Sequence, residues 1–266
     1  MKRFAVRSRT ALALLAAIAG STYVGAADRS GYLATTLDIT AVVPPPPKKG
    51  DPRYDADRRV FRVTRALLDT PRGQLAVNDI PTSVPDLMRD FSCACGTKLS
   101  PKTTPATYRL LVNADADTQR ANDAAKQQWK RLRPFLIDRG PDCQSKEELA
   151  RSYDYPSGHT THAWTISLIL ADLEPGRASQ ILARARAYGE SRIVCGAHNM
   201  SAVEAGRLGA TISLQQVRLD ARYQADAASA RAELQNRVDR TTDLDPASCS
   251  AEQAIADPSV LARLRR

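Results

Sequence analysis

Three histidines, His159, His162 and His198, are the only ones in the chain, so any imidazole chemistry must use them. His159 follows a proline, Ser157 and Gly158, and a mostly apolar run comes directly after it. A hydroxyl residue and a glycine ahead of such a run are typical of the capped N-terminus of a buried helix. The free N–H groups and the dipole of that helix end favour a bound anion. The segment therefore predicts an anion site with an acid–base group in the first helical turn.

Basic residues that could share this anion stand on both sides of the segment. Lys126 and Arg133 are seven residues apart, nearly two helical turns, so we expect both on one face of a helix. Arg192 and His198 bracket a turn between two expected helices, where Gly196 would let the backbone approach a ligand closely. Arginine forks onto phosphate oxygens and lysine acts as a point charge, although a basic pair on a helix face is usually only solvated.

The order of these groups along the chain is more specific than any one of them. The three groups are Lys126-x6-Arg133-Pro134, Pro156-Ser157-Gly158-His159 and Ser191-Arg192-x5-His198. This order resembles the three-part signature of the type 2 phosphatidic acid phosphatase (PAP2) superfamily. That superfamily includes bacterial class A non-specific acid phosphatases, lipid phosphatases and vanadate-dependent haloperoxidases. Segments outside the signature also look like the secreted class A enzymes, among them Asp51-Pro52 after a proline run, Ser92-Cys93-Ala94 and Trp129 to Phe135.

The resemblance implies an acid phosphatase that hydrolyses phosphate monoesters through a phosphohistidine intermediate, with no metal and no cofactor. By that resemblance His198 is the nucleophile and His159 donates a proton to the departing alcohol. The substrate-binding residues would be Lys126, Arg133, Ser157, Gly158 and Arg192. His162 lies outside the signature, and we expect it to be structural. Because a proton donor must start protonated and an imidazole titrates near 6.5, activity should favour acidic pH.

One position departs from the family pattern. The third motif of the family continues with three residues and then an aspartate that hydrogen-bonds the nucleophilic histidine, but Ala202 stands there in this chain. Ser201, a backbone carbonyl or a carboxylate from elsewhere could replace it. Glu204 should point away, because two residues along a helix turn the side chain by about 200°. Two alternatives therefore stay open: a catalytically degenerate phosphate-binding homologue, and a vanadate-dependent haloperoxidase, since vanadate mimics phosphate.

Composition indicates an exported protein of moderate charge. Residues 1–26 have a basic start, an apolar stretch and a small-residue end at Val24-Gly25-Ala26, which is typical of a signal peptide and predicts a periplasmic location. Its removal takes away four of the 38 basic residues and none of the 29 acidic ones, leaving 34 against 29, or +5. Few aromatic residues accompany the basic ones, so we expect no nucleic-acid partner. We expect no membrane span either, small phosphomonoesters as substrates and, by resemblance, a homo-oligomer.

The chain predicts a single compact all-α domain of many helices. Residues 27–52, with Pro44 to Pro47, should form an extended proline-rich arm, because consecutive prolines fix a polyproline II conformation. Residues 53–241 should form the helical PAP2-type domain, and 242–266 a polar C-terminal tail. The helices that matter most for the site are expected at 105–133, 158–173, 177–192 and 200–239, the last with Leu219 on its inner edge.

Cysteine usage fits an oxidising compartment. The five cysteines are Cys93, Cys95, Cys143, Cys195 and Cys249. We expect two disulfides and one free thiol, with the pairing left open.

Overall fold

The computed structural model describes residues 31–237 and 244–262, and within these ranges every regular element is a helix. The expected signal peptide, residues 1–26, lies outside them. The α-helices of the described part are α1 (Pro52–Thr64), α2 (Pro71–Asn78), α3 (Val84–Cys95), α4 (Pro105–Trp129), α5 (Lys146–Leu149), α6 (Gly158–Leu173), α7 (Ala178–Val194), α8 (Met200–Val217), α9 (Ala221–Gln235) and α10 (Pro246–Ala256). The expected all-α fold is confirmed.

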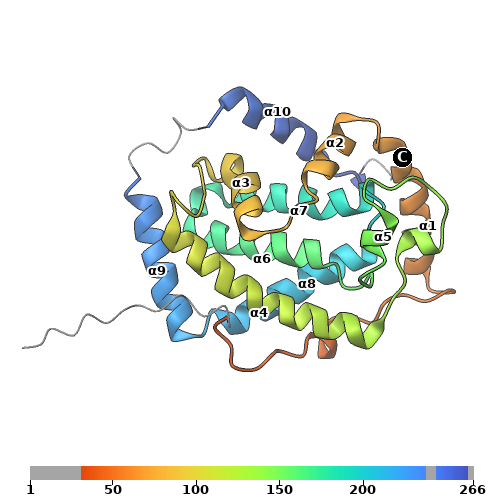
Figure 1. Ribbon diagram of the computed structural model, residues 1–266, viewed down its shortest axis with the longest axis horizontal. Coiled ribbons are helices and arrows are strands. Elements are labelled where there is room, and N and C mark those ends of the chain that lie inside the picture. Colours follow the sequence, from red (N-terminus) through yellow and green to blue (C-terminus); the bar gives the residue numbers. More distant parts are fainter. Residues whose placement is uncertain (1–30, 238–243, 263–266) are drawn as a thin grey trace, which may run out of the picture.

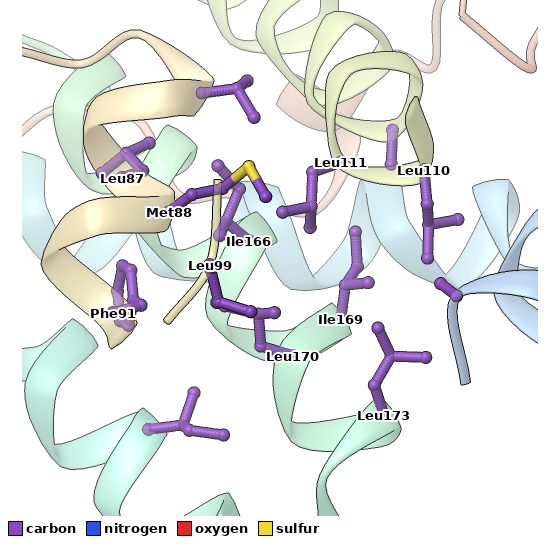
Figure 2. Close-up of a cluster of buried hydrophobic side chains, with 14 of the residues drawn as sticks. Leu87, Met88, Phe91, Leu99, Leu110, Leu111, Ile166, Ile169, Leu170 and Leu173 are labelled. Carbon is purple, nitrogen blue, oxygen red and sulfur yellow. The ribbon is translucent and has the colours of Figure 1, made fainter. Parts of the chain in front are cut away.

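Helix α6 occupies the middle of the molecule, and α4, α7 and α8 pack against it (Figure 1). It is buried on nearly all sides, as expected of a helix whose apolar residues do not keep to one face. Figure 2 shows how its leucine and isoleucine side chains meet those of α3 and α4. Labelled there are Leu87, Met88, Phe91, Leu99, Leu110, Leu111, Ile166, Ile169, Leu170 and Leu173. This core fixes α6, and with it the N-terminal end that carries Gly158 and His159.

Helix α4 is shorter than expected, because it ends at Trp129 instead of Arg133. Lys130 adopts the left-handed conformation with a φ of 48° and caps the helix through its N–H, which donates to the carbonyl of Lys126. The placement of Lys126 and Arg133 on one face of one helix was therefore wrong. Arg133 lies beyond the helix in an extended conformation.

The long helix expected over residues 200–239 is divided into α8 and α9. The break falls before Asp220, whose carboxylate accepts hydrogen bonds from the N–H groups of Arg222 and Tyr223 and so starts a new helix. Leu219, expected on the inner edge, lies in this break and is 71% exposed.

Two disulfides and one free cysteine are present among the described residues, as expected. Cys93 pairs with Cys249 and Cys143 with Cys195, while Cys95 is buried and free. The first bridge connects α3 to α10, a helix in the region where we expected only a polar tail over residues 242–266. The sequence expectation missed this helix because its residues have little apolar periodicity, and Asp245 supplies its N-cap.

The described part of the proline-rich arm lies against the helical domain. Ile39 and Val43 are buried against α4 and α8, and the Tyr155 hydroxyl donates to the Pro44 carbonyl at 2.6 Å. No described helix is both long and apolar enough to cross a membrane.

Candidate active site

A cavity of about 420 Å³ opens at the N-terminal end of α6 and collects most of the residues singled out in the sequence. Residues of the predicted site that line it are Lys126, Arg133, Gly158, His159 and His198. The ring centroids of His159 and His198 are 6.4 Å apart, so both imidazoles can reach one small ligand. Ser157 and Arg192 are fully buried and do not line the cavity itself.

Ser157 is the N-cap of α6, as its place in the sequence predicts. Its hydroxyl oxygen accepts hydrogen bonds from the N–H and the hydroxyl group of Thr160, at 3.3 and 2.9 Å. Its own N–H donates to the carbonyl of Ala202 at 2.9 Å, which fastens the start of α6 to α8. A hydroxyl has one donor and two acceptor sites, so only the donor of Ser157 is left for a ligand.

His198 lies in the turn between α7 and α8, where the sequence placed it. Gly196 has a φ of +83°, but its role differs from the expected approach to a ligand. A Cβ at this position would come within 2.2 Å of Asp142 and 2.4 Å of Arg65. The positive φ is what favours glycine here, because any other side chain would be strained in this conformation and would also displace the ends of Asp142 and Arg65.

The contacts of the His198 ring determine its tautomer. Arg133, which can only donate, places Nη1 2.8 Å from Nε2, so Nε2 must carry the lone pair. The ring proton then sits on Nδ1, which donates to the backbone oxygen of Asp154 at 2.7 Å and to its Oδ1 at 3.1 Å. Burial lowers the pKa of His198 well below its usual value, and the positive charges of Arg133 and Lys126 lower it further. His198 is thus a neutral imidazole whose Nε2 lone pair accepts a hydrogen bond from Arg133.

His159 has the opposite tautomer. Its Nε2 is 3.0 Å from the carbonyl oxygen of Ile80, which can only accept, so Nε2 carries the proton and Nδ1 is free to bind another. Burial lowers the pKa of His159 well below its usual value, and the charge of Arg192 and the ring of His198 contribute in the same direction. A bound anion would reverse the effect of these neighbouring charges.

Three buried cations surround the two imidazoles. Within the described ranges none of them forms an ion pair with a carboxylate, and Nε and Nη1 of Arg192 have no hydrogen-bond partner. Nη2 of Arg192 donates to Gln144 at 2.7 Å, and Nζ of Lys126 donates to the carbonyl of Tyr153 at 3.0 Å. Burial lowers the pKa of Lys126 to about 8 and that of Arg192 to about 10. Buried, poorly compensated cations favour an anionic ligand.

Asp154 is one residue of this site that sequence reasoning missed. It precedes Pro156 by two positions, but no spacing rule indicates that the loop before α6 reaches the His198 ring. Ser201, one of the considered replacements for the absent aspartate, instead accepts from Arg131 and donates to Asp57. Glu204 is exposed, in agreement with the expectation that it points away.

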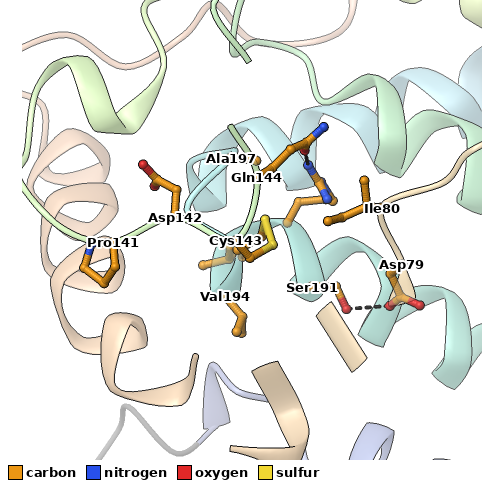
Figure 3. Close-up of a disulfide and its surroundings, with 12 residues drawn as sticks. Asp79, Ile80, Pro141, Asp142, Cys143, Gln144, Ser191, Val194 and Ala197 are labelled. Atoms are coloured by element: carbon orange, nitrogen blue, oxygen red, sulfur yellow. Dashed lines mark hydrogen bonds between the residues drawn. A yellow bond between two sulfur atoms is a disulfide. The ribbon is translucent and has the colours of Figure 1, made fainter. Parts of the chain in front are cut away.

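Gln144 was also missed, and a disulfide accounts for its position. Figure 3 shows Cys143 and Gln144 on a loop at the end of α7, with Ala197 beside them. The bridge to Cys195 and a hydrogen bond from the N–H of Cys143 to the Cys195 carbonyl at 3.0 Å fix this loop on the end of α7. Gln144 is thereby placed to accept from Arg192.

His162, expected to be structural, also lines the cavity. Its Nδ1–H donates to the carboxylate of Asp115 at 2.7 Å. The described residues contain no group of three or more histidine, cysteine or acidic side chains that could hold a metal ion.

Comparison with known proteins finds one matching family model and several similar acid phosphatases. Residues 109–222 match the model of the PAP2 superfamily. The chain is 36% identical over 212 residues to an acid phosphatase of Zymomonas mobilis, covering 79% of this chain and 80% of that protein. It is 33% identical over 198 residues to a non-specific acid phosphatase of Salmonella typhimurium (73% and 79% covered) and 31% identical over 200 residues to one of Providencia stuartii (74% and 81%).

Proposed function

The chain belongs to the PAP2 superfamily, and we propose that it is an exported acid phosphatase that hydrolyses phosphate monoesters through a phosphohistidine on His198. The relatives named acid phosphatase support the activity. The observation that carries the mechanism is the His198 ring, whose Nε2 lone pair lies among buried cations and within reach of His159. Two disulfides fit an oxidising compartment such as the periplasm.

The phosphoryl group binds between the imidazoles of His159 and His198, in the part of the cavity that we call the cup. Lys126, Arg133 and Arg192 neutralise its oxygens, and the unpartnered Nε and Nη1 atoms of Arg192 gain hydrogen bonds. The N–H of Gly158 at the start of α6 and the hydroxyl proton of Ser157 complete the set of donors. Arg133 exchanges its contact with Nε2 of His198 for the phosphate, which frees the lone pair.

In the first step Nε2 of His198 attacks phosphorus, and the bond from phosphorus to the ester oxygen breaks. Protonated Nδ1 of His159 gives its proton to the departing alcohol oxygen. In the second step water attacks the phosphohistidine while the now neutral His159 takes a proton from it. The N–P bond breaks, inorganic phosphate leaves, and both imidazoles return to their initial states.

Hydrolysis of p-nitrophenyl phosphate from about pH 4 to about pH 8 tests the proposal. We expect wild type to be much faster than His198→Ala, and its kcat/KM to fall as pH rises, because the pKa of His159 is lowered and its protonated form is lost toward neutrality. We expect the phosphohistidine intermediate to be labile in acid. Labelled phosphate transferred from the substrate to the protein should therefore be recovered on the protein when the reaction is stopped with alkali. If wild type is no faster than His198→Ala, the chain only binds phosphate and the enzyme proposal is rejected.

Removal of metals should leave the activity unchanged. Three side-chain cations, Lys126, Arg133 and Arg192, provide the positive charge that a metal would otherwise supply. We expect the same kcat before and after dialysis against a chelator, measured with p-nitrophenyl phosphate. A loss of activity that is restored by a divalent cation would contradict metal-independent hydrolysis.

We also propose a homo-oligomer, which light scattering coupled to size-exclusion chromatography would test.

A further inference from the structure

We propose that Asp154 is the positioning residue for His198 and replaces, from the loop before α6, the carboxylate that position 202 lacks. The inference rests on the proposed function, because it assigns a role in the same reaction. Asp154 and His198 are separated by 44 positions in the sequence, and both are buried. Asp154 acts through the nucleophile and has no contact with the substrate in this proposal.

Asp154 presents two acceptors to the same ring nitrogen. Its backbone oxygen is 2.7 Å from Nδ1 of His198 and its Oδ1 is 3.1 Å away. Both acceptors favour a proton on Nδ1 and so direct the Nε2 lone pair toward the cavity. The carboxylate adds a negative charge beside a ring that becomes positive when Nε2 attacks phosphorus.

Neighbouring donors hold the carboxylate in this position. Asn199 donates from its backbone N–H to Oδ1 at 3.1 Å and from its side chain to Oδ2 at 2.7 Å. Arg131 lies 3.3 Å from Oδ2, and its carbonyl accepts the N–H of Asp154 at 2.9 Å. Because every neighbour of the two oxygens is a donor, an ionised carboxylate fits and an amide does not.

The chain also offers a matched control. Asp57 is equally buried, pairs with the same Arg131 at 2.7 Å and accepts two hydrogen bonds from Ser201, at 2.9 and 2.6 Å. Within the part of the chain that the structure describes, Asp57 makes no hydrogen bond to His198. Asp57→Asn therefore removes a buried charge next to Arg131 just as Asp154→Asn does, but leaves the contacts of the nucleophile intact.

The experiment compares the two variants in kcat, KM and unfolding free energy. We expect similar losses of stability from both, while only Asp154→Asn lowers kcat. The expected loss is about 10²- to 10⁴-fold, the range between removing one oxyanion-hole donor and replacing the triad carboxylate in other hydrolases. KM should change little, because Asp154 does not touch the substrate. Equal kcat values in Asp154→Asn and Asp57→Asn would overturn the proposal, as would a gain in kcat from Ala202→Asp in the wild-type background.

A second measurement does not depend on whether a variant folds. Nitrogen-15 NMR of the His198 ring in the wild-type protein should show the proton on Nδ1 near neutral pH, and a proton on Nε2 would overturn the proposal. The two hypotheses fail differently. If wild type does not hydrolyse phosphate esters but the Nδ1–H tautomer is present, the proposed function fails; if wild type is active and Asp154→Asn behaves like Asp57→Asn, only the role of Asp154 fails.

Discussion

At the scale of single residues, Lys126 is the cation of the site whose charge depends most directly on pH. Its ammonium group is buried and donates to the carbonyl of Tyr153 and weakly to the Ser152 hydroxyl, at 3.0 and 3.5 Å. Neither partner is charged. The pKa of Lys126 is about 8, because burial and the nearby Arg133 disfavour the ammonium form more than Asp154 favours it.

This low pKa predicts weaker phosphate binding in alkali. Lys126 is charged below about pH 8 and loses its proton as pH rises through that value, so its attraction for phosphate disappears in the same range. A hydrogen bond to a charged group contributes about 1.5–3 kcal/mol, so the inhibition constant of inorganic phosphate should rise about 10- to 100-fold above the transition. Competitive inhibition of p-nitrophenyl phosphate hydrolysis, measured at a series of pH values, gives this constant.

Lys126→Arg is the control for that measurement, because a guanidinium keeps its charge throughout the range. Its inhibition constant should stay nearly flat where that of wild type rises. Parallel curves for the two proteins would mean that another group causes the transition.

The sequence indicated which residues line this cavity better than it indicated their neighbours. Residue type and motif order indicated His159 and His198, because each motif is local and its chemistry depends on the residue itself. Asp154 could not be found in this way. Its contact with His198 joins two loops that are far apart in the sequence and are brought together by the packing of α6 against α8. The sequence contains no local sign of that contact.

At the scale of elements, the errors occurred where helices end. Apolar periodicity located the bodies of the helices, but α4 stops at a left-handed Lys130, a conformation that sequence rules assign mainly to glycine or asparagine. The break between α8 and α9 depends on an Asp220 cap in a continuous helical pattern. In both cases the helix ends at a capping residue that apolar periodicity does not indicate.

The disulfide between Cys143 and Cys195 should matter for activity as well as stability. It closes a sequence separation of 52 residues and holds the loop that carries Gln144 against the end of α7. The double variant Cys143→Ala/Cys195→Ala should lose roughly 2–5 kcal/mol of unfolding free energy. Its kcat/KM should also fall, because Arg192 loses the acceptor that orients it.

The other bridge is the comparison for this effect. Cys93→Ala/Cys249→Ala removes a link over 156 residues between α3 and α10, neither of which lines the cavity. We expect a similar loss in denaturant unfolding but an unchanged kcat/KM of the folded enzyme. If both double variants lose activity equally, the loop with Gln144 has no special role.

At the scale of the whole molecule, residues from four separate segments meet at one end of the helix bundle. Lys126 comes from the end of α4, Arg133 from the segment after it, His159 from the start of α6 and His198 from the turn before α8. Helices α4 and α8 both pack against α6, so one core determines the geometry of the cup. The order of motifs indicated this convergence only through the family resemblance, since periodicity does not specify which helix ends meet.

A core substitution far from the cup should therefore change stability without changing chemistry. Leu170 is fully buried in α6, twelve residues after Gly158, which is about 18 Å along the helix axis. Leu170→Ala should cost about 2–5 kcal/mol of unfolding free energy, because it leaves a cavity in close-packed surroundings. Leu219→Ala, at a position that is 71% exposed, should change it by less than about 0.5 kcal/mol. Under conditions where both variants are folded, kcat should equal that of wild type; a lower kcat in Leu170→Ala would show that the core transmits its relaxation along α6 to His159.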